Sequence, residues 1–130
     1  MLDPVWIGED LAIAIHQRQL AEHGGIEGVR DPGLLSSALS RPKHMLAFSE
    51  GPPGLAGLAA AYAFGIAKNH PFLDGNKRTA YVVCRTFLIL NGQDINATQE
   101  EKYLKFLQLA EGALSEGELA EWLDSHLEEI

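Results

Sequence analysis

The chain has 130 residues, of which 46% are hydrophobic, and its net charge is −8. This length and apolar content suit a single domain over residues 1–130 that folds without a covalent staple. The acidic balance argues against direct nucleic-acid binding, which needs a basic face, and no apolar run approaches the ~20 residues that cross a bilayer. Cys84 is the only cysteine and the first residues lack a signal-peptide pattern, so we expect a cytoplasmic protein without membrane partners.

The first predicted helix covers residues 9–23. Gly8 is a suitable N-cap for this helix, and Gly24-Gly25 ends it. Asp31-Pro32 is typical of a helix start, and it predicts a second, short helix that reaches about Ser40.

Residues 41–54 contain three prolines and two glycines, which predicts an exposed loop or a short hairpin. A third helix is expected over residues 55–69, where apolar side chains recur at helical spacing. The fourth helix should begin near Asn76 and stop at Asn91-Gly92. It is apolar almost all round, so we expect it to be the buried central helix.

Two capping boxes mark the last two helices. Thr98 with Glu101 opens one of them, and Ser115 with Glu118 opens the other. Strand character is confined to two short stretches, residues 4–7 and 93–97. The sequence therefore predicts an all-α fold, a bundle of about six helices around one buried helix.

The loop from His70 to Arg78 concentrates residue types that suit phosphate chemistry. It leads into a helix N-terminus, whose free N–H groups attract phosphate oxygens, and Gly75 lacks the Cβ that would block close approach of an anion. Asp74 is the lone carboxylate, and one carboxylate with substrate phosphates is a usual Mg²⁺ site. Histidine is the residue type that most often serves as a general base, so His70 is the candidate for this role.

The remaining polar residues of the loop add to the same site. Asn76 is able to donate from its amide, and Lys77 and Arg78 bring charge and directed donors. Four of the ten basic residues lie within residues 68–85, whereas ten of the eighteen acids lie from Asp94 onward. A positive island in an acidic chain suits a compact anion such as a nucleotide, although a solvated helix face would show the same charges.

Each of these residues also has a purely structural interpretation. His70 could cap the last carbonyls of the preceding helix, Asp74 could be a turn residue or an N-cap, and Asn76 could be a plain cap. Phe72 is best interpreted as a core anchor that pins the loop. The coincidence of so many suitable residue types within nine positions favours a functional site.

The stretch His70-Pro-Phe-Leu-Asp-Gly-Asn-Lys-Arg78 resembles the signature of the Fic/Doc superfamily, His-x-Phe-x-Asp/Glu-Gly-Asn-Gly-Arg-x-x-Arg. It departs at Lys77, where most Fic enzymes have glycine, and at Tyr81, where they have the second arginine. Both departures, together with the Thr79-Ala80 pair, are similar to the Doc (death-on-curing) branch. Residues 24–35 and 38–42 also look like the Doc N-terminal region, so the resemblance covers roughly residues 6–93.

The resemblance implies a role for each matching position. His70 would deprotonate a target hydroxyl, and Asp74 would hold Mg²⁺. The triphosphate of ATP would be bound by the residues at the start of the helix, with Lys68 as a further contact: Gly75, Asn76, Lys77 and Arg78. The loop over residues 41–53 would be a flap that holds the target segment by strand addition.

The resemblance also implies the function. The first hypothesis is a Doc-like kinase toxin that transfers the γ-phosphoryl of ATP to a Ser or Thr of a translation factor, with elongation factor Tu as the suggested target, and so inhibits translation. The alternatives are transfer of AMP to a protein hydroxyl and a non-catalytic binding module. The chain lacks the Ser/Thr-x-x-x-Glu-Gly-x-x-x-Asn helix of self-inhibited Fic proteins, so we expect a cognate antitoxin that inhibits in trans.

Overall fold

The structure is a computed structural model that describes residues 3–51 and 53–130. Within these residues the chain forms six helices and one two-stranded sheet, so the predicted mainly α-helical fold is confirmed. The elements are α1 (Glu9–His23), α2 (Pro32–Phe48), α3 (Leu55–Asn69), α4 (Asn76–Leu90), β1 (Gln93–Ile95), α5 (Gln99–Glu111), α6 (Glu116–Asp124) and β2 (Leu127–Glu129).

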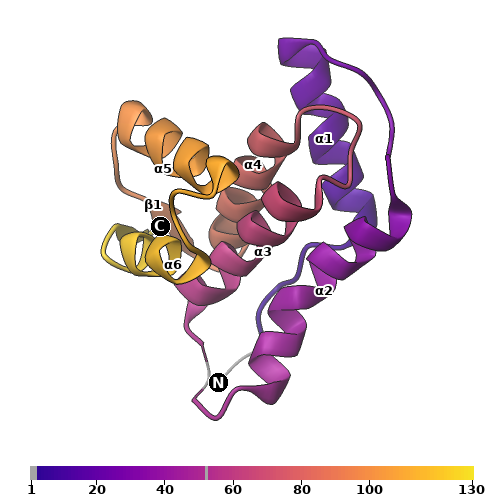
Figure 1. The fold of residues 1–130 in the computed structure, drawn as a ribbon. Coiled ribbons are helices and arrows are strands. Elements are labelled where there is room, and N and C mark those ends of the chain that lie inside the picture. The colour runs from indigo at the N-terminus through magenta and orange to yellow at the C-terminus, as the bar shows by residue number, and fades with distance from the viewer. Residues whose placement is uncertain (1–2, 52) are drawn as a thin grey trace.

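Helices α3 and α4 lie in the middle of the molecule, with α1 and α2 on one side and α5 and α6 on the other (Figure 1). Ten of the fifteen residues of α3 are buried, against six of the fifteen of α4. The most deeply buried helix is therefore α3, which packs against α2, α4, α5 and α6, and not the helix that begins at Asn76. Its many alanines explain this position, because short side chains let four neighbouring helices approach closely.

Helix α2 is longer than the sequence predicted. It continues beyond Ser40 to Phe48 with Pro42 inside it, so the loop or hairpin expected over residues 41–54 is wrong for its first eight residues. Pro42 lacks the N–H that would bond the Ala38 carbonyl, but it is buried and belongs to the face of α2 that packs on α3. Gly65 of α3 lies so close to α2 that an added Cβ would be 3.1 Å from Ala38 Cα. This close packing of the two helices outweighs the tendency of Pro42 to end a helix.

The segment 41–53 consequently does not form the predicted flap. Residues 41–48 are helical, and the described residues between α2 and α3, 49–51 and 53–54, contain no strand that a target peptide could extend. Pro52 lies outside the described residues.

The ends of the other helices follow the sequence prediction. Helices α1 and α3 have the predicted bounds, and α4 begins at Asn76 and ends at Leu90. Both capping boxes are present: Thr98 accepts a hydrogen bond from the N–H of Glu101, and Ser115 accepts one from Glu118. Capping oxygens at these positions satisfy N–H groups that the helix itself leaves free.

One of the two predicted strand segments is a strand. Residues 93–95 form β1, which pairs antiparallel with β2, in register Gln93 with Glu129. Residues 4–7 are not a strand. Instead, Val5 exchanges hydrogen bonds with the side-chain amide of Asn91, at 2.8 and 3.0 Å, which ties the N-terminal segment to the end of α4.

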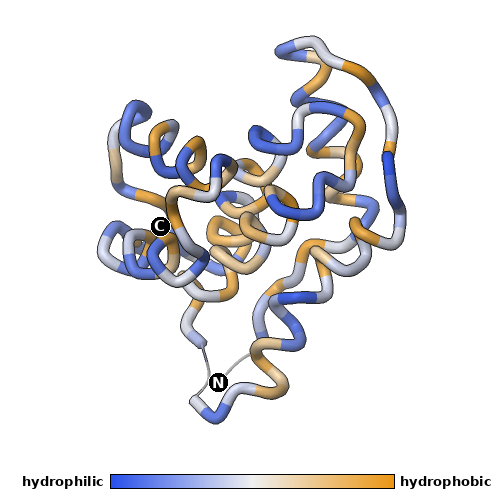
Figure 2. Tube along the Cα trace, in the orientation of Figure 1, coloured by the Kyte–Doolittle hydropathy of each residue, from blue (hydrophilic) through white to orange (hydrophobic). Residues whose placement is uncertain are grey.

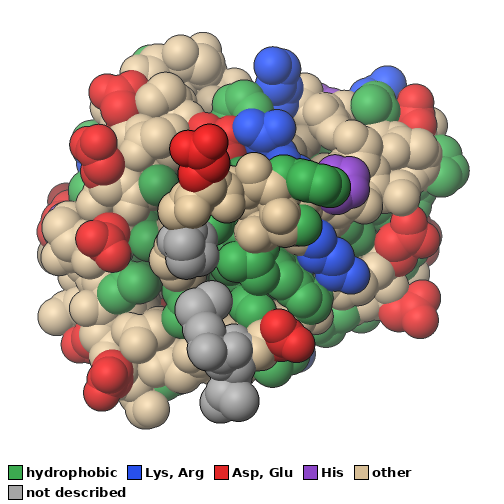
Figure 3. Space-filling view, turned by 90° about the horizontal axis from the view of Figure 1, so that it is seen from below, with side chains coloured by type: hydrophobic (Ala, Val, Ile, Leu, Met, Phe, Trp, Pro, Cys, Tyr) green, Lys and Arg blue, Asp and Glu red, His purple; other side chains and the backbone are tan. Residues whose placement is uncertain are grey.

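The surface is acidic and the interior apolar. Apolar residues dominate α3, whereas apolar and polar residues alternate along the outer helices (Figure 2). On the face shown in Figure 3, acidic side chains are widely spread and basic side chains gather toward one side, beside a histidine. None of the helices in the described part of the chain is both long enough and apolar enough to span a membrane.

Candidate active site

The loop of residues 70–75 joins the C-terminus of α3 to the N-terminus of α4. It turns sharply because both of its ends adopt left-handed backbone conformations, His70 with φ 49° and Gly75 with φ 74°. Phe72, between them, is 1% exposed and anchors the loop in the core, as predicted.

Gly75 is required for its backbone conformation. A Cβ on Gly75 would lie 3.5 Å from Leu20 and 3.8 Å from His16, which is ordinary contact on the α1 side. The positive φ by itself requires the absence of a Cβ, and the predicted role of Gly75, room for the close approach of an anion, stays a prediction.

We expect Gly75→Ala to destabilise the protein by about 1–2 kcal/mol more than Gly54→Ala. Gly75 is the N-cap of α4 and Gly54 is the N-cap of α3, but Gly54 has φ −72° and open space where a Cβ would lie. The difference between the two variants in chemical denaturation isolates the cost of the positive φ. Equal destabilisation would show that the left-handed conformation of Gly75 is not needed.

A pocket of about 380 Å³ opens beside this loop. It brings together six of the seven predicted site residues, and its lining consists of His70, Leu73, Asp74, Gly75, Asn76, Lys77 and Arg78. The seventh, Lys68, does not line it. Lys68 is exposed near the end of α3, and its ammonium lies 5.3 Å from the centre of the Phe64 ring.

The imidazole of His70 is available for chemistry. His70 is exposed, and within the described residues its ring makes no hydrogen bond. Capping of α3 is carried out by its backbone, since the His70 N–H donates to the Ile66 carbonyl at 3.1 Å. The ring is thus free to accept a proton inside the pocket.

The Asp74 carboxylate is held by two backbone donors. Oδ2 accepts the N–H of Ile26 at 3.1 Å, and Oδ1 accepts the N–H of Gly75 at 2.9 Å. The N–H of Ile26, followed by that of Gly75, lowers the pKa of this carboxyl below its ordinary value. The side chain therefore stays ionised, and each oxygen keeps a second lone pair for a cation.

Asn76 staples the loop. Its side-chain oxygen accepts the Phe72 N–H at 3.0 Å, and its amide donates to the Phe72 carbonyl at 2.9 Å. The N-cap of α4 is Gly75 and not Asn76, and the Asn76 amide keeps a second N–H that the Phe72 carbonyl does not use. Asn76 therefore offers its backbone N–H and one side-chain N–H for a ligand contact.

The start of α4 offers an anion site. In the described part of the chain no hydrogen bond reaches the backbone N–H groups of Asn76, Lys77 or Arg78, and the first intrahelical bond is made by Thr79 to Gly75. Such free N–H groups carry the positive end of the helix dipole. With the Lys77 and Arg78 side chains beside them, they suit phosphate oxygens.

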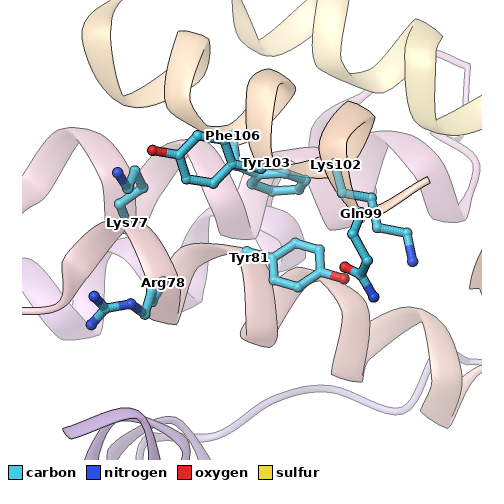
Figure 4. Close-up of a pocket in the computed structure, with 7 residues that line it drawn as sticks. All are labelled: Lys77, Arg78, Tyr81, Gln99, Lys102, Tyr103 and Phe106. Carbon is cyan, nitrogen blue, oxygen red and sulfur yellow. The ribbon is translucent and has the colours of Figure 1, made fainter. Parts of the chain in front are cut away.

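A second cleft, of about 300 Å³, adjoins the first and lies between α4 and α5. It shares Lys77 and Arg78 with the loop pocket, and its other lining residues are Tyr81, Gln99, Lys102, Tyr103 and Phe106. Figure 4 shows Lys77 and Arg78 projecting from one end of α4 and the Tyr81 ring directed toward Gln99. The Lys77 ammonium lies 5.3 Å from the centre of the Tyr103 ring, a cation–π contact between the helices.

Arg85 does not take part in either pocket. Its guanidinium makes two hydrogen bonds to the Asp94 carboxylate, at 3.0 and 3.1 Å. This pairing holds the pKa of Asp94 below its ordinary value. Arg85 lies one turn beyond Tyr81 and is already paired with Asp94. It therefore cannot replace the second arginine of the Fic signature, whose position Tyr81 occupies.

Sequence reasoning missed two residues that support the loop from a distance. Arg30 donates to the carbonyls of Asn69 and His70, both at 2.7 Å, and so closes the end of α3. His16 of α1 stacks on Phe72 and bonds the Asp74 carbonyl. No spacing pattern could reveal them, because they lie 39 to 58 positions from their partners.

The segment between α1 and α2 also lies against the loop. Val29 forms an antiparallel bridge with Phe72, and the Leu73 N–H donates to the Gly28 carbonyl at 3.1 Å. With the Ile26–Asp74 bond, these contacts make residues 26–30 one wall of the loop.

Comparison with known proteins defines the class of protein to which this fold and loop belong. Residues 6–88 match the sequence profile of the Fic/DOC family. The chain is therefore a member of the Fic/DOC family, and the predicted resemblance is confirmed.

Two curated relatives narrow the similarity to the Doc branch. The chain is 43% identical over 74 residues to "Toxin Doc" of Mycolicibacterium smegmatis (strain ATCC 700084 / mc(2)155), a match that covers 57% of each chain. It is 33% identical over 89 residues to "Protein kinase doc" of Escherichia phage P1, which covers 68% of this chain and 70% of the relative.

Proposed function

We propose that the protein is a Doc-type toxin of a toxin–antitoxin pair, a kinase that transfers the γ-phosphoryl of ATP to a Ser or Thr of a translation factor. The observation that carries the proposal is the loop pocket, where His70, Asp74 and the cationic start of α4 meet. The names of the two relatives support the toxin and kinase parts of the proposal. Elongation factor Tu is the proposed target, and arrest of translation in the cytoplasm is the proposed outcome.

The residues present fit ATP with Mg²⁺. Asp74 is an exposed, ionised carboxylate with free lone pairs. Neither around Asp74 nor in the rest of the described residues do three acidic, histidine or cysteine side chains gather into a full protein cage. A site with one carboxylate suits Mg²⁺, which takes its other ligands from phosphates and water. When bound, Mg²⁺ would neutralise charge on the transferred and departing oxygens.

In the proposed reaction an imidazole nitrogen of His70 accepts the proton of the target hydroxyl. The hydroxyl oxygen forms a bond to the γ-phosphorus, and the bond from that phosphorus to the β–γ bridging oxygen breaks, which leaves ADP. The free N–H groups of α4, with Lys77 and Arg78, bind the phosphate oxygens. In this scheme Gly75 acts through its backbone and Asn76 through its N–H groups, while Lys68, which does not line the pocket, would reach the phosphates only with its long side chain.

The proposed orientation of ATP rests on Tyr81 and Lys77. Tyr81 packs edge-on against Phe106, with ring centres 5.0 Å apart, and supplies no bidentate positive charge. Lys77 brings an ammonium where a glycine would allow only backbone contact. A triphosphate held by an arginine at position 81 and by close backbone contact at position 77 would present its α-phosphate to His70. Tyr81 and Lys77 disfavour that arrangement and favour presentation of the γ-phosphate.

Intact-mass measurement of purified translation factors tests the proposed function. After incubation with the protein and Mg·ATP, elongation factor Tu should gain one phosphoryl group. A nucleotidyl increment would assign the chain to AMP transfer, and unchanged masses for all factors would contradict an enzyme that acts on translation.

A toxin in its own cytoplasm needs silencing, so we propose a cognate antitoxin that acts in trans. Expression of this chain alone should arrest growth, and co-expression of the antitoxin should restore it. A His70→Asn variant, expressed at the same level, is the matched control and should be harmless. Normal growth of cells that contain active enzyme and no antitoxin would contradict this partner.

A further inference from the structure

His16 of α1 is one of three buried polar residues in the described part of the chain, with 2% of its surface exposed. Its ring lies flat on the ring of Phe72, with centroids 3.9 Å apart and planes 8° from parallel. Burial of an imidazole has a desolvation cost unless the ring finds partners. The partners of His16 are both in the loop that lines the site.

The hydrogen bond of His16 has a defined direction. Nε2 lies 2.8 Å from the carbonyl oxygen of Asp74. A carbonyl oxygen only accepts, so Nε2 must carry the hydrogen and donate it. His16 therefore binds the backbone of the residue whose side chain is proposed to hold Mg²⁺.

The peptide between Asp74 and Gly75 transmits this contact to the carboxylate. The peptide is planar and trans, so its carbonyl and its N–H point in opposite directions. The carbonyl faces His16, and the N–H of Gly75 donates to Asp74 Oδ1 at 2.9 Å. Fixing the carbonyl thus fixes the N–H that holds the Asp74 side chain.

We infer that His16 is a positioning residue that orients the Asp74 carboxylate through the Asp74–Gly75 peptide. The inference deepens the proposed function and rests on it for the role of Mg²⁺, but the positioning is a property of the protein alone. His16 also fixes the loop at Phe72, two residues from His70, so its ring and its donor hold the loop together.

Two variants separate the ring from the donor. His16→Phe keeps a flat ring against Phe72 and removes the N–H, whereas His16→Gln keeps a side-chain N–H and removes the ring. Gln19→Leu is the matched control, because Gln19 is a buried polar residue of the same helix and makes no hydrogen bond to the loop among the described residues.

The first readout is amide-resolved NMR of the protein without nucleotide or metal. In His16→Phe the Gly75 and Ile26 amides should shift and exchange faster with solvent, while His16→Gln should stay close to the wild type at both. Unmoved Gly75 and Ile26 amides in His16→Phe would overturn the inference. An equal change in Gln19→Leu would also overturn it, since the effect would then be a general loosening of α1.

The second readout is the Mg²⁺ concentration that half-saturates phosphoryl transfer. His16→Phe should raise it about 10–100-fold, the usual effect of losing a residue that orients a metal ligand, and the rate should recover at high Mg²⁺. An unchanged Mg²⁺ requirement in a variant whose Gly75 amide has moved would contradict the link to the carboxylate. A wild-type protein that transfers no phosphoryl group would contradict the proposed function. The NMR comparison would still decide whether His16 positions Asp74.

Discussion

Phosphoryl transfer by a His70→Asn variant should be about 10²–10⁴-fold slower than by the wild type, because a general base contributes a factor of this size. Asparagine suits this position for a structural reason. His70 has φ 49°, and asparagine tolerates the left-handed region better than most residues. The backbone bonds of His70 to Ile66 and Arg30 remain available in the variant. The loss of rate should therefore come with little change in melting temperature.

The stability measurement decides between the catalytic and the structural interpretation of His70. Circular dichroism melting of His70→Asn and of His70→Ala compares a side chain that suits the left-handed conformation with one that suits it less. We expect the alanine variant to be the less stable and both to be inactive. Full activity in a well-folded asparagine variant would show that His70 is not the base.

Asp74→Asn should weaken Mg·ATP binding at least about tenfold, which corresponds to about 1.4 kcal/mol. The variant loses the charge that attracts the cation. Its amide also offers one acceptor oxygen where the carboxylate offers two, so it cannot hold the N–H groups of Ile26 and Gly75 together. Calorimetry with Mg·ATP measures the loss of affinity.

Binding of ATP without metal shows whether Asp74→Asn weakens nucleotide binding through the loss of the metal contact or through a general change in the site. In the presence of a chelator the variant should bind ATP no more weakly than the wild type, because a negative charge beside the phosphates has been removed. Asp10→Asn, an exposed acid in the first turn of α1, controls for net charge. If the wild type binds ATP equally well with and without Mg²⁺ and the variant matches it, Asp74 is not a metal residue.

Local sequence signals predicted most of the fold because most helix ends are set locally. The capping boxes at Thr98 and Ser115 and the glycine pair after His23 act within a few residues of the ends they define. Pro42 misled the prediction because its local preference is outweighed by packing of α2 on α3, a contact between segments more than twenty residues apart.

In the candidate site, too, local sequence signals predicted one part of the structure and contacts between distant segments set the other. The nine-residue signature identified the residues that line the loop pocket, but it did not reveal how they are held. Gly75 is needed for its positive φ, and the Asn76 amide is bonded to Phe72. The supports from Arg30 and His16 come from other elements, so only the folded chain shows them.

The central claim is that the γ-phosphate of ATP faces His70, and the fate of label from two forms of radioactive ATP tests it most directly. Elongation factor Tu incubated with this protein and Mg²⁺ should become labelled from γ-labelled ATP and not from α-labelled ATP. Tyr81 and Lys77 are the structural reason for this expectation. Tyr81 lacks the charge of the second arginine in the Fic signature, and Lys77 replaces its glycine, so the contacts that would present the α-phosphate are missing. Label that enters from α-labelled ATP alone would contradict the account and show that the protein transfers AMP.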